Sequence, residues 1–170
     1  MNRFENLRKA LSARGVDALL VLDELNQRYL SGFAFTDGFL LITASEAYLV
    51  TDFRYYESAG KQAYPEFEVV MPSDRTAFLD EKLSAAGAKT VGFEGGSVSY
   101  ATYLSYKKAH PAVAFVDIGG LLEEIRQRKT PEELEKMQKA QDITDLAFSH
   151  IVKMLTPKMT EIEVAAELEY

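Results

Sequence analysis

The sequence contains no cysteine and only two histidines among its 170 residues. Without cysteine, disulfides, thiolate metal sites and cysteine nucleophiles are excluded. The sequence also has no apolar stretch near the roughly 20 residues that a helix needs to cross a bilayer. The first twelve residues carry charges throughout, unlike a secretory signal. We therefore expect a cytoplasmic protein.

Clustered basic residues are also scarce. The formal net charge is -7, and the densest basic group is Arg126, Arg128 and Lys129, directly after Glu123 and Glu124. Nucleic-acid phosphates and anionic membrane surfaces both require clustered lysine or arginine. We therefore expect neither nucleic acid nor a membrane as a partner.

Motifs of catalysis are missing as well. There is no GxSxG, and His110 and His150 belong to no HExxH, HxH or HxxE pattern. We interpret both as surface or satisfied histidines rather than metal ligands. The sequence thus predicts that this polypeptide alone catalyses nothing.

The pair Gly95-Gly96 lies after an apolar run but matches neither GxGxxG nor GxxxxGK(S/T). Glu94 stands where it would repel a phosphate. We interpret both glycines as ordinary turn residues.

The remaining pattern alternates helices with short apolar strands in a chain that is 47% hydrophobic. Helices are expected at 2–14, 55–63, 75–86 and 99–109, a short helix or turn at 24–30, and strands at 16–23, 39–43, 47–51, 67–71, 89–94 and 112–118. The two strands at 39–51 form a tight hairpin. This order predicts a three-layer α/β/α fold with a mixed, mostly buried sheet.

The segment after the hairpin places three functional side chains where a strand gives way to a helix. These are Asp52, Arg54 and Tyr55. The structural interpretation is that Asp52 caps the helix and that Arg54 pairs with its carboxylate or with loop carbonyls. The loop before the hairpin, Gly32 to Gly38, carries two phenylalanines that we expect to pack in the core.

The last forty residues have a different pattern. Pro131 to Leu155 reads as one long helix, with Thr130 as its N-cap and a glutamate three residues later. Thr160 starts a second helix that is cut off at Tyr170. This pattern predicts a long linker helix and a fragment of something longer.

Three segments of the region 26–58 resemble the amino-terminal domain of the creatinase, prolidase and aminopeptidase P family. They are NxRYLSGF, DGFLLIT and YLVTDFRYYESA, and the family motif falls here on Asn26, Tyr29, Gly32, Asp52, Arg54 and Tyr55. A later segment, RQRKTPEELEKMQKAQDITDLAF, looks like the opening of the family's catalytic domain. The resemblance implies a creatinase-like accessory domain over 1–128, then a linker helix and the truncated start of a pita-bread catalytic domain over 129–170.

The resemblance also implies a metal-dependent parent enzyme that hydrolyses the bond between a residue and a following proline, as a dipeptidase or an aminopeptidase. Two aspartates, one histidine and two glutamates would hold two divalent metal ions (manganese, cobalt or zinc). The metal pair would generate the hydroxide that attacks the scissile carbonyl. None of these five ligands is expected before residue 170.

Relatives use the amino-terminal domain to form a homodimer and to place a loop near the partner's active-site mouth, which restricts substrates to short proline-containing peptides. The matching gating loop here consists of Phe33, Phe35, Thr36, Asp37 and Gly38. The resemblance implies that Asp37 meets the amino terminus of the substrate and that Phe33 or Phe35 walls the proline pocket.

Two other functions stay open from the sequence. One is a non-catalytic protein-binding module derived from the same family, which the acidic balance would suit if its partner is basic. The other is a stand-alone flavodoxin-like domain that binds a small molecule at the carboxyl ends of its strands.

Overall fold

The computed structural model describes residues 3–169, which form two compact units: one up to Ile125 and one from Arg126 onward. None of the helices within residues 3–169 is long and apolar enough to cross a membrane. Up to Gln127, the helices and strands follow the predicted order, with one further helix at the end. In chain order they are α1 (Arg3–Ala13), β1 (Ala18–Val21), α2 (Glu24–Ser31), β2 (Gly38–Ile42), β3 (Ala47–Thr51), α3 (Tyr56–Gln62), β4 (Glu68–Val70), α4 (Arg75–Ala85), β5 (Thr90–Phe93), α5 (Tyr100–Ala109), β6 (Ala114–Asp117) and α6 (Leu121–Gln127).

The six strands form one mixed sheet in the order β4-β3-β2-β1-β5-β6. Strand β2 pairs antiparallel with β1 and β3, and the other pairs are parallel. Every strand except β2 therefore runs in the same direction. Their carboxyl ends lie along one edge of the sheet, together with the first residue of β2. We call this edge the carboxyl edge.

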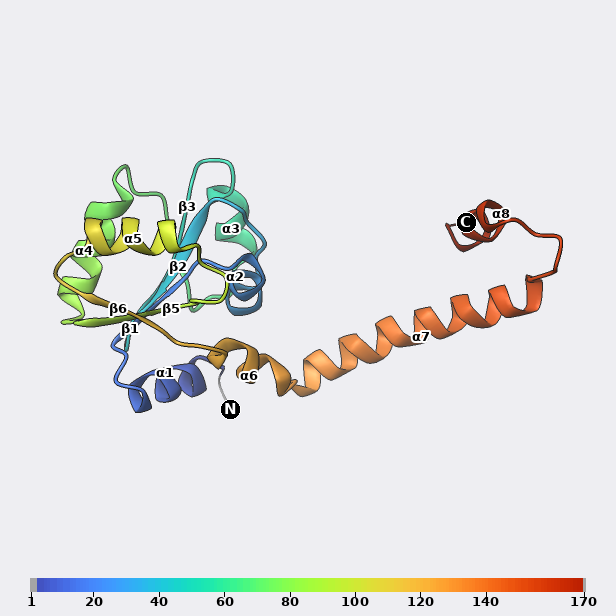
Figure 1. Ribbon diagram of the computed structural model, residues 1–170, viewed down its shortest axis with the longest axis horizontal. Helices are drawn as coiled ribbons and strands as arrows, with labels where there is room; N and C mark the ends of the chain where they lie inside the picture. The colour runs from blue at the N-terminus through green and yellow to red at the C-terminus, as the bar shows by residue number, and fades with distance from the viewer. Residues whose placement is uncertain (1–2, 170) are drawn as a thin grey trace. The chain divides into compact units, whose positions relative to one another are not determined.

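Both faces of the sheet are covered, which confirms the predicted three-layer fold (Figure 1). Leu19 and Val21 of β1 face a core formed with α1, α2, α3 and α6, whereas Ala18 and Leu20 face a second core with α4. Helix α5 lies over this second face through Tyr106. Because successive side chains point to opposite faces, the central strands are buried on both sides and read as continuous apolar runs.

Two local predictions were wrong or incomplete. Helix α3 has Tyr55 as its N-cap, with no side-chain capping bond, so Asp52 does not cap it. The carboxylate of Asp52 instead accepts hydrogen bonds from the backbone N–H and Nε of Arg54, at 2.9 and 2.8 Å. Helix α6 was not predicted, although Leu121 and Leu122 bury one of its faces.

The second unit contains α7 (Pro131–Met154) and α8 (Glu161–Glu169). Thr130 and Glu133 form the predicted capping box, with proline at the first helical position. At the start of α8, Thr160 and Glu163 bond reciprocally in the same way. Neither helix contains a buried residue.

Candidate functional site

The candidate site is the loop of residues 33–38, which joins α2 to β2 at the carboxyl edge. Helix α2 ends at Ser31, and Gly32 takes the left-handed conformation that closes it, with φ 73°. The Ser31 hydroxyl donates to the carbonyl of Gln27 and accepts from the backbone N–H of Phe33. These contacts fix where the loop starts.

The far end of the loop is fixed by a close backbone approach at Gly38. Its φ is 149°, and a Cβ atom built there would lie 1.9 Å from the carbonyl oxygen of Val50. Only glycine fits this position. Gln27 Nε2 donates to the Gly38 carbonyl at 3.3 Å, and the Thr51 hydroxyl donates to the Asp37 carbonyl at 3.2 Å.

Two phenylalanines turn inward from the loop. Phe33 and Phe35 are 7% and 3% exposed, which confirms that they pack in the core. Their rings stack at 6.1 Å, and the ring of Tyr55 lies edge-on to both, at 6.3 and 6.4 Å. The Tyr55 hydroxyl is 2.9 Å from the hydroxyl of Thr36. The loop is therefore anchored by an aromatic cluster with one hydrogen bond at its rim.

Asp37 is the centre of a charged cluster on the outer side of the loop. One carboxylate oxygen accepts from Arg54 at 2.7 Å and the other from Arg75 at 2.8 Å. Arg54 also pairs with Asp52 at 2.6 Å. The pKa of Asp52 lies below its usual value, chiefly because of the hydrogen bond from Arg54. Two carboxylates and two guanidinium groups give this cluster a net charge of zero.

The structure thus joins Asp52, Arg54 and Tyr55 to the loop, although they follow it by more than a dozen residues. Asn26, from the same family motif, lies elsewhere on the carboxyl edge. Its Nδ2 donates to Glu94 Oε1 at 3.3 Å. Tyr29 packs, partly buried, against the core of the first unit.

From the sequence, Glu94 is interpreted only as a group that would repel a phosphate, whereas the structure gives it hydrogen bonds at the carboxyl edge. It is 4% exposed, and its Oε2 accepts from the backbone N–H groups of Leu22 at 2.8 Å and Asp23 at 3.4 Å. Burial raises its pKa to about 7, against the effect of these hydrogen bonds. Gly95 and Gly96 lie in a turn, as the sequence predicts, and a Cβ at Gly95 would lie 2.4 Å from the Asp117 carboxyl carbon.

A cavity of about 340 Å³ opens beside the loop, on the face of the sheet that α4 and α5 cover. Its wall includes Thr36, Asp37 and Phe39 from the loop and β2. The other side consists of Arg75, Thr76 and Leu79 of α4 and of Ser105, Tyr106, Ala109 and His110 at the end of α5. Charged, hydroxyl-bearing and apolar side chains therefore meet in one hollow.

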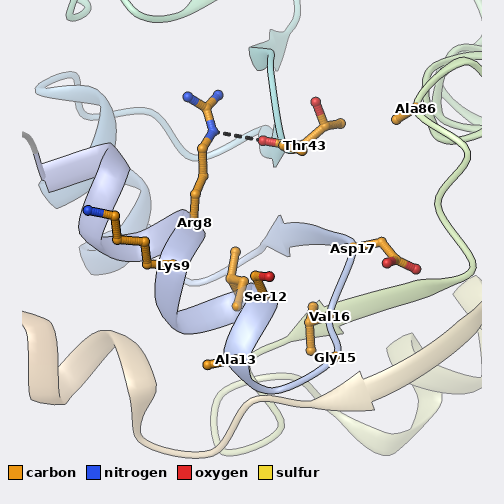
Figure 2. Close-up of a pocket in the computed structure, with 11 residues that line it drawn as sticks. Arg8, Lys9, Ser12, Ala13, Gly15, Val16, Asp17, Thr43 and Ala86 are labelled. Carbon is orange, nitrogen blue, oxygen red and sulfur yellow. Dashed lines mark hydrogen bonds between the residues drawn. The ribbon is translucent and has the colours of Figure 1, made fainter.

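A larger hollow of about 650 Å³ lies at the opposite edge of the sheet (Figure 2). Two of its charged groups, Arg8 and Asp17, bind backbone groups. Arg8 donates to the carbonyls of Thr43 and Glu46, at 2.9 and 3.1 Å. Asp17 accepts from the N–H groups of Lys89 and Thr90, both at 2.8 Å. These contacts give the hollow a structural explanation.

Residues 3–169 contain no group of three or more histidine, aspartate or glutamate side chains that could hold a metal ion. His110 Nδ1 lies 2.7 Å from Asp80, and His150 Nε2 lies 2.7 Å from Glu167. Both histidines thus have a carboxylate partner, which agrees with the prediction that they are surface or satisfied residues.

Comparisons with known proteins define the family. Residues 3–128 match the creatinase/prolidase N-terminal domain, and residues 135–170 match metallopeptidase family M24. The chain therefore belongs to the creatinase/prolidase family, as its motifs predict.

Similar proteins include Xaa-Pro dipeptidases and aminopeptidases. A Xaa-Pro dipeptidase of known structure from Bacillus anthracis shares 35% sequence identity with this chain. The structural match has a TM-score of 0.87 and covers 98% of this chain and 47% of the dipeptidase. An X-Pro aminopeptidase from Thermotoga maritima is 30% identical with a TM-score of 0.83, covering 100% and 48%. The Xaa-Pro dipeptidase of Pyrococcus furiosus is 28% identical over 99% of this chain and 47% of its own length. The chain spans about half the length of the curated relatives that it matches.

Proposed function

We propose that this chain is the amino-terminal part of a Xaa-Pro dipeptidase or aminopeptidase. Residues 1–128 would be the accessory domain, and 129–170 the linker helix and the start of the catalytic domain. The two successive family matches carry this proposal, because a match to the N-terminal domain at 3–128 is followed by a match to the metallopeptidase family at 135–170. Since the relatives compared above are peptidases, they favour this proposal over a binding module.

The proposed role of the first unit is to gate substrates in a homodimer. Loop 33–38 would lie at the mouth of the partner's active site and admit only short proline-containing peptides. Its construction supports this role, because a gate discriminates by size only if it keeps its shape. The aromatic cluster and the two ion pairs of Asp37 hold both sides of the loop.

The parent enzyme would hold its two divalent metal ions, with manganese, cobalt or zinc as candidates, on residues outside this chain. The match to metallopeptidase family M24 supports this proposal. The whole enzyme would work in the cytoplasm. The chain by itself would supply positioning and substrate selection rather than chemistry.

A substrate amino group that contacts Asp37, as expected, would have to compete with hydrogen bonds that Asp37 already accepts. Both carboxylate oxygens already accept from arginines, so an incoming ammonium must share or replace one of these donors. The two guanidinium groups are only part-buried, with 51% of the Arg54 side chain and 36% of that of Arg75 exposed. Exposed ion pairs of this kind are weak, so such an exchange costs little.

The test is to express the complete protein encoded by the gene of this chain, beside the 170-residue chain, and to measure free proline released from Xaa-Pro dipeptides. Matched Xaa-Ala dipeptides are the control substrates. We expect the complete protein to release proline and to leave the alanine dipeptides intact, and the chain alone to hydrolyse neither. A complete protein that cleaves no Xaa-Pro bond would overturn the proposal.

A further inference from the structure

The cavity beside loop 33–38 contains one fixed charge of each sign. Asp37 and Arg75 both line it, and their direct contact is 2.8 Å long. Asp37 keeps a second partner in Arg54, whereas Asp37 is the one hydrogen-bond and ion-pair partner of Arg75 among residues 3–169. Four of its five N–H groups thus make no hydrogen bond to the described part of the chain. This pair can open without leaving Asp37 unpaired.

The rest of the wall offers neutral polar groups and an apolar floor. The Tyr106 hydroxyl makes no hydrogen bond to any residue that the structure describes, and the pKa of Tyr106 is raised by burial. Its ring stacks against His110 at 5.9 Å. Phe39 and Leu79, which are 4% and 1% exposed, form an apolar part of the cavity wall. The volume of about 340 Å³ falls at the lower end of the range for small-molecule sites.

We propose that this cavity binds a free zwitterionic amino acid with an apolar side chain. Its carboxylate would accept hydrogen bonds from the Arg75 guanidinium, which matches a carboxylate with two parallel N–H groups. Its ammonium would donate to the Asp37 oxygen that Arg75 leaves, and its side chain would rest on Phe39 and Leu79. A ligand with both charges replaces both halves of the broken ion pair.

A ligand with one charge can replace only one partner of the Asp37–Arg75 ion pair. A carboxylate without an ammonium would leave Asp37 short of one donor, and an ammonium without a carboxylate would leave Arg75 unpaired. Since hydrogen bonds to charged groups are the strong ones, each missing half should weaken binding about tenfold or more. The site therefore discriminates zwitterions from simple anions and cations.

Occupation of the cavity would also act on the loop. Arg75 belongs to α4, so its contact with Asp37 ties the loop to the helix layer. An amino acid bound between Asp37 and Arg75 would replace their direct contact with a longer one through the ligand, while Arg54 still donates to the other carboxylate oxygen. Binding is a property of this chain and does not depend on the peptidase proposal. If that proposal also holds, the ligand is of the kind that dipeptide hydrolysis releases.

The test is a titration of the isotope-labelled 170-residue chain with L-leucine, followed by amide NMR shifts. We expect saturable shifts concentrated at residues 36–39, 75–79 and 105–110. N-acetyl-L-leucine and L-leucinamide, which each lack one charge, should bind about tenfold more weakly or not at all. Shifts that are absent, unsaturable or equal for all three compounds would overturn the proposal.

Two variants locate the site. Arg75→Gln should weaken L-leucine binding about tenfold or more, because glutamine offers no charge to the carboxylate. Lys61→Gln is the matched control, since it also breaks one exposed ion pair, with Glu57 on α3, away from the cavity. Far-UV circular dichroism checks that both variants fold. Equal binding by Arg75→Gln and the unmodified chain would refute the assignment, whatever the outcome of the peptidase assay.

Discussion

Replacement of Glu94 by glutamine tests how the carboxyl edge is held together. Glu94 joins the ends of β5 and β1 to α2, through hydrogen bonds from Leu22, Asp23 and Asn26. Glutamine keeps the size and one acceptor oxygen, which can still receive the two backbone N–H groups. The Asn26 amide can then turn its oxygen toward the new NH₂ group. The substitution therefore removes the charge and preserves the shape.

The size and sign of the effect follow from the Glu94 pKa, which burial raises from 4.5 to about 7. The folded chain keeps this proton up to about pH 7, whereas the unfolded chain releases it near 4.5. The stabilising contribution is therefore fully present below pH 4.5 and is lost as the pH rises through 7. The difference between the Glu94 pKa in the folded and in the unfolded chain corresponds to about 3 kcal/mol in the free energy of unfolding.

Urea unfolding at a series of pH values measures this loss. Tyrosine fluorescence is a suitable signal, because every tyrosine except Tyr170 lies in the first unit. The unmodified chain and Glu94→Gln should be about equally stable near pH 4.5. Between pH 4.5 and 8, Glu94→Gln should gain about 3 kcal/mol relative to the unmodified chain, a shift in midpoint of about 1–3 M urea.

Comparison with Glu94→Gln distinguishes the pH dependence of stability due to Glu94 from that due to acids with lowered pKa values. Asp17 and Asp52 lose their stabilising contribution as the pH falls below their ordinary range, outside this window. They also titrate equally in both proteins. A stability difference that stays constant between pH 4.5 and 8 would refute the buried-charge argument.

Two glycine substitutions test the backbone of the first unit. Gly38→Ala should lower the free energy of unfolding by about 3 kcal/mol or more in urea titrations, because its Cβ would lie 1.9 Å from the Val50 carbonyl oxygen. Gly60→Ala in α3 has open space around its Cβ and should raise the same quantity by about 0.5–1 kcal/mol. Equal effects at both positions would contradict the conformation of loop 33–38.

The sequence predicts the elements of this fold because their signals are local. Apolar runs such as Leu40 to Ile42, paired with a second run across a short turn, indicate strands buried on both faces, and Thr130 with Glu133 marks a helix start within four residues. The pairing of Arg54 with Asp52 is also local, two residues apart. These features need no knowledge of the sheet order.

The site depends on contacts that only the folded sheet creates. Asp37 meets Arg75 across 38 residues of sequence, and Asn26 meets Glu94 across 68. In the sequence, Glu94 is simply a polar residue after an apolar run. Its contacts with the end of β1 become apparent only when β5 pairs with β1. The charge and hydroxyl pattern of the cavity could therefore not be predicted from the sequence.

The central claim is that loop 33–38, held by Asp37, selects short substrates. Its most direct test is the KM of Asp37→Ala in the complete enzyme for Xaa-Pro dipeptides and for longer Xaa-Pro peptides. Stability should change by no more than about 1 kcal/mol, because the Asp37 ion pairs are partly exposed. Glu57→Ala, which breaks an exposed ion pair on α3, is the control. We expect a higher KM for dipeptides in Asp37→Ala alone, with longer peptides nearly unaffected, whereas an unchanged dipeptide KM would refute the gating role of Asp37.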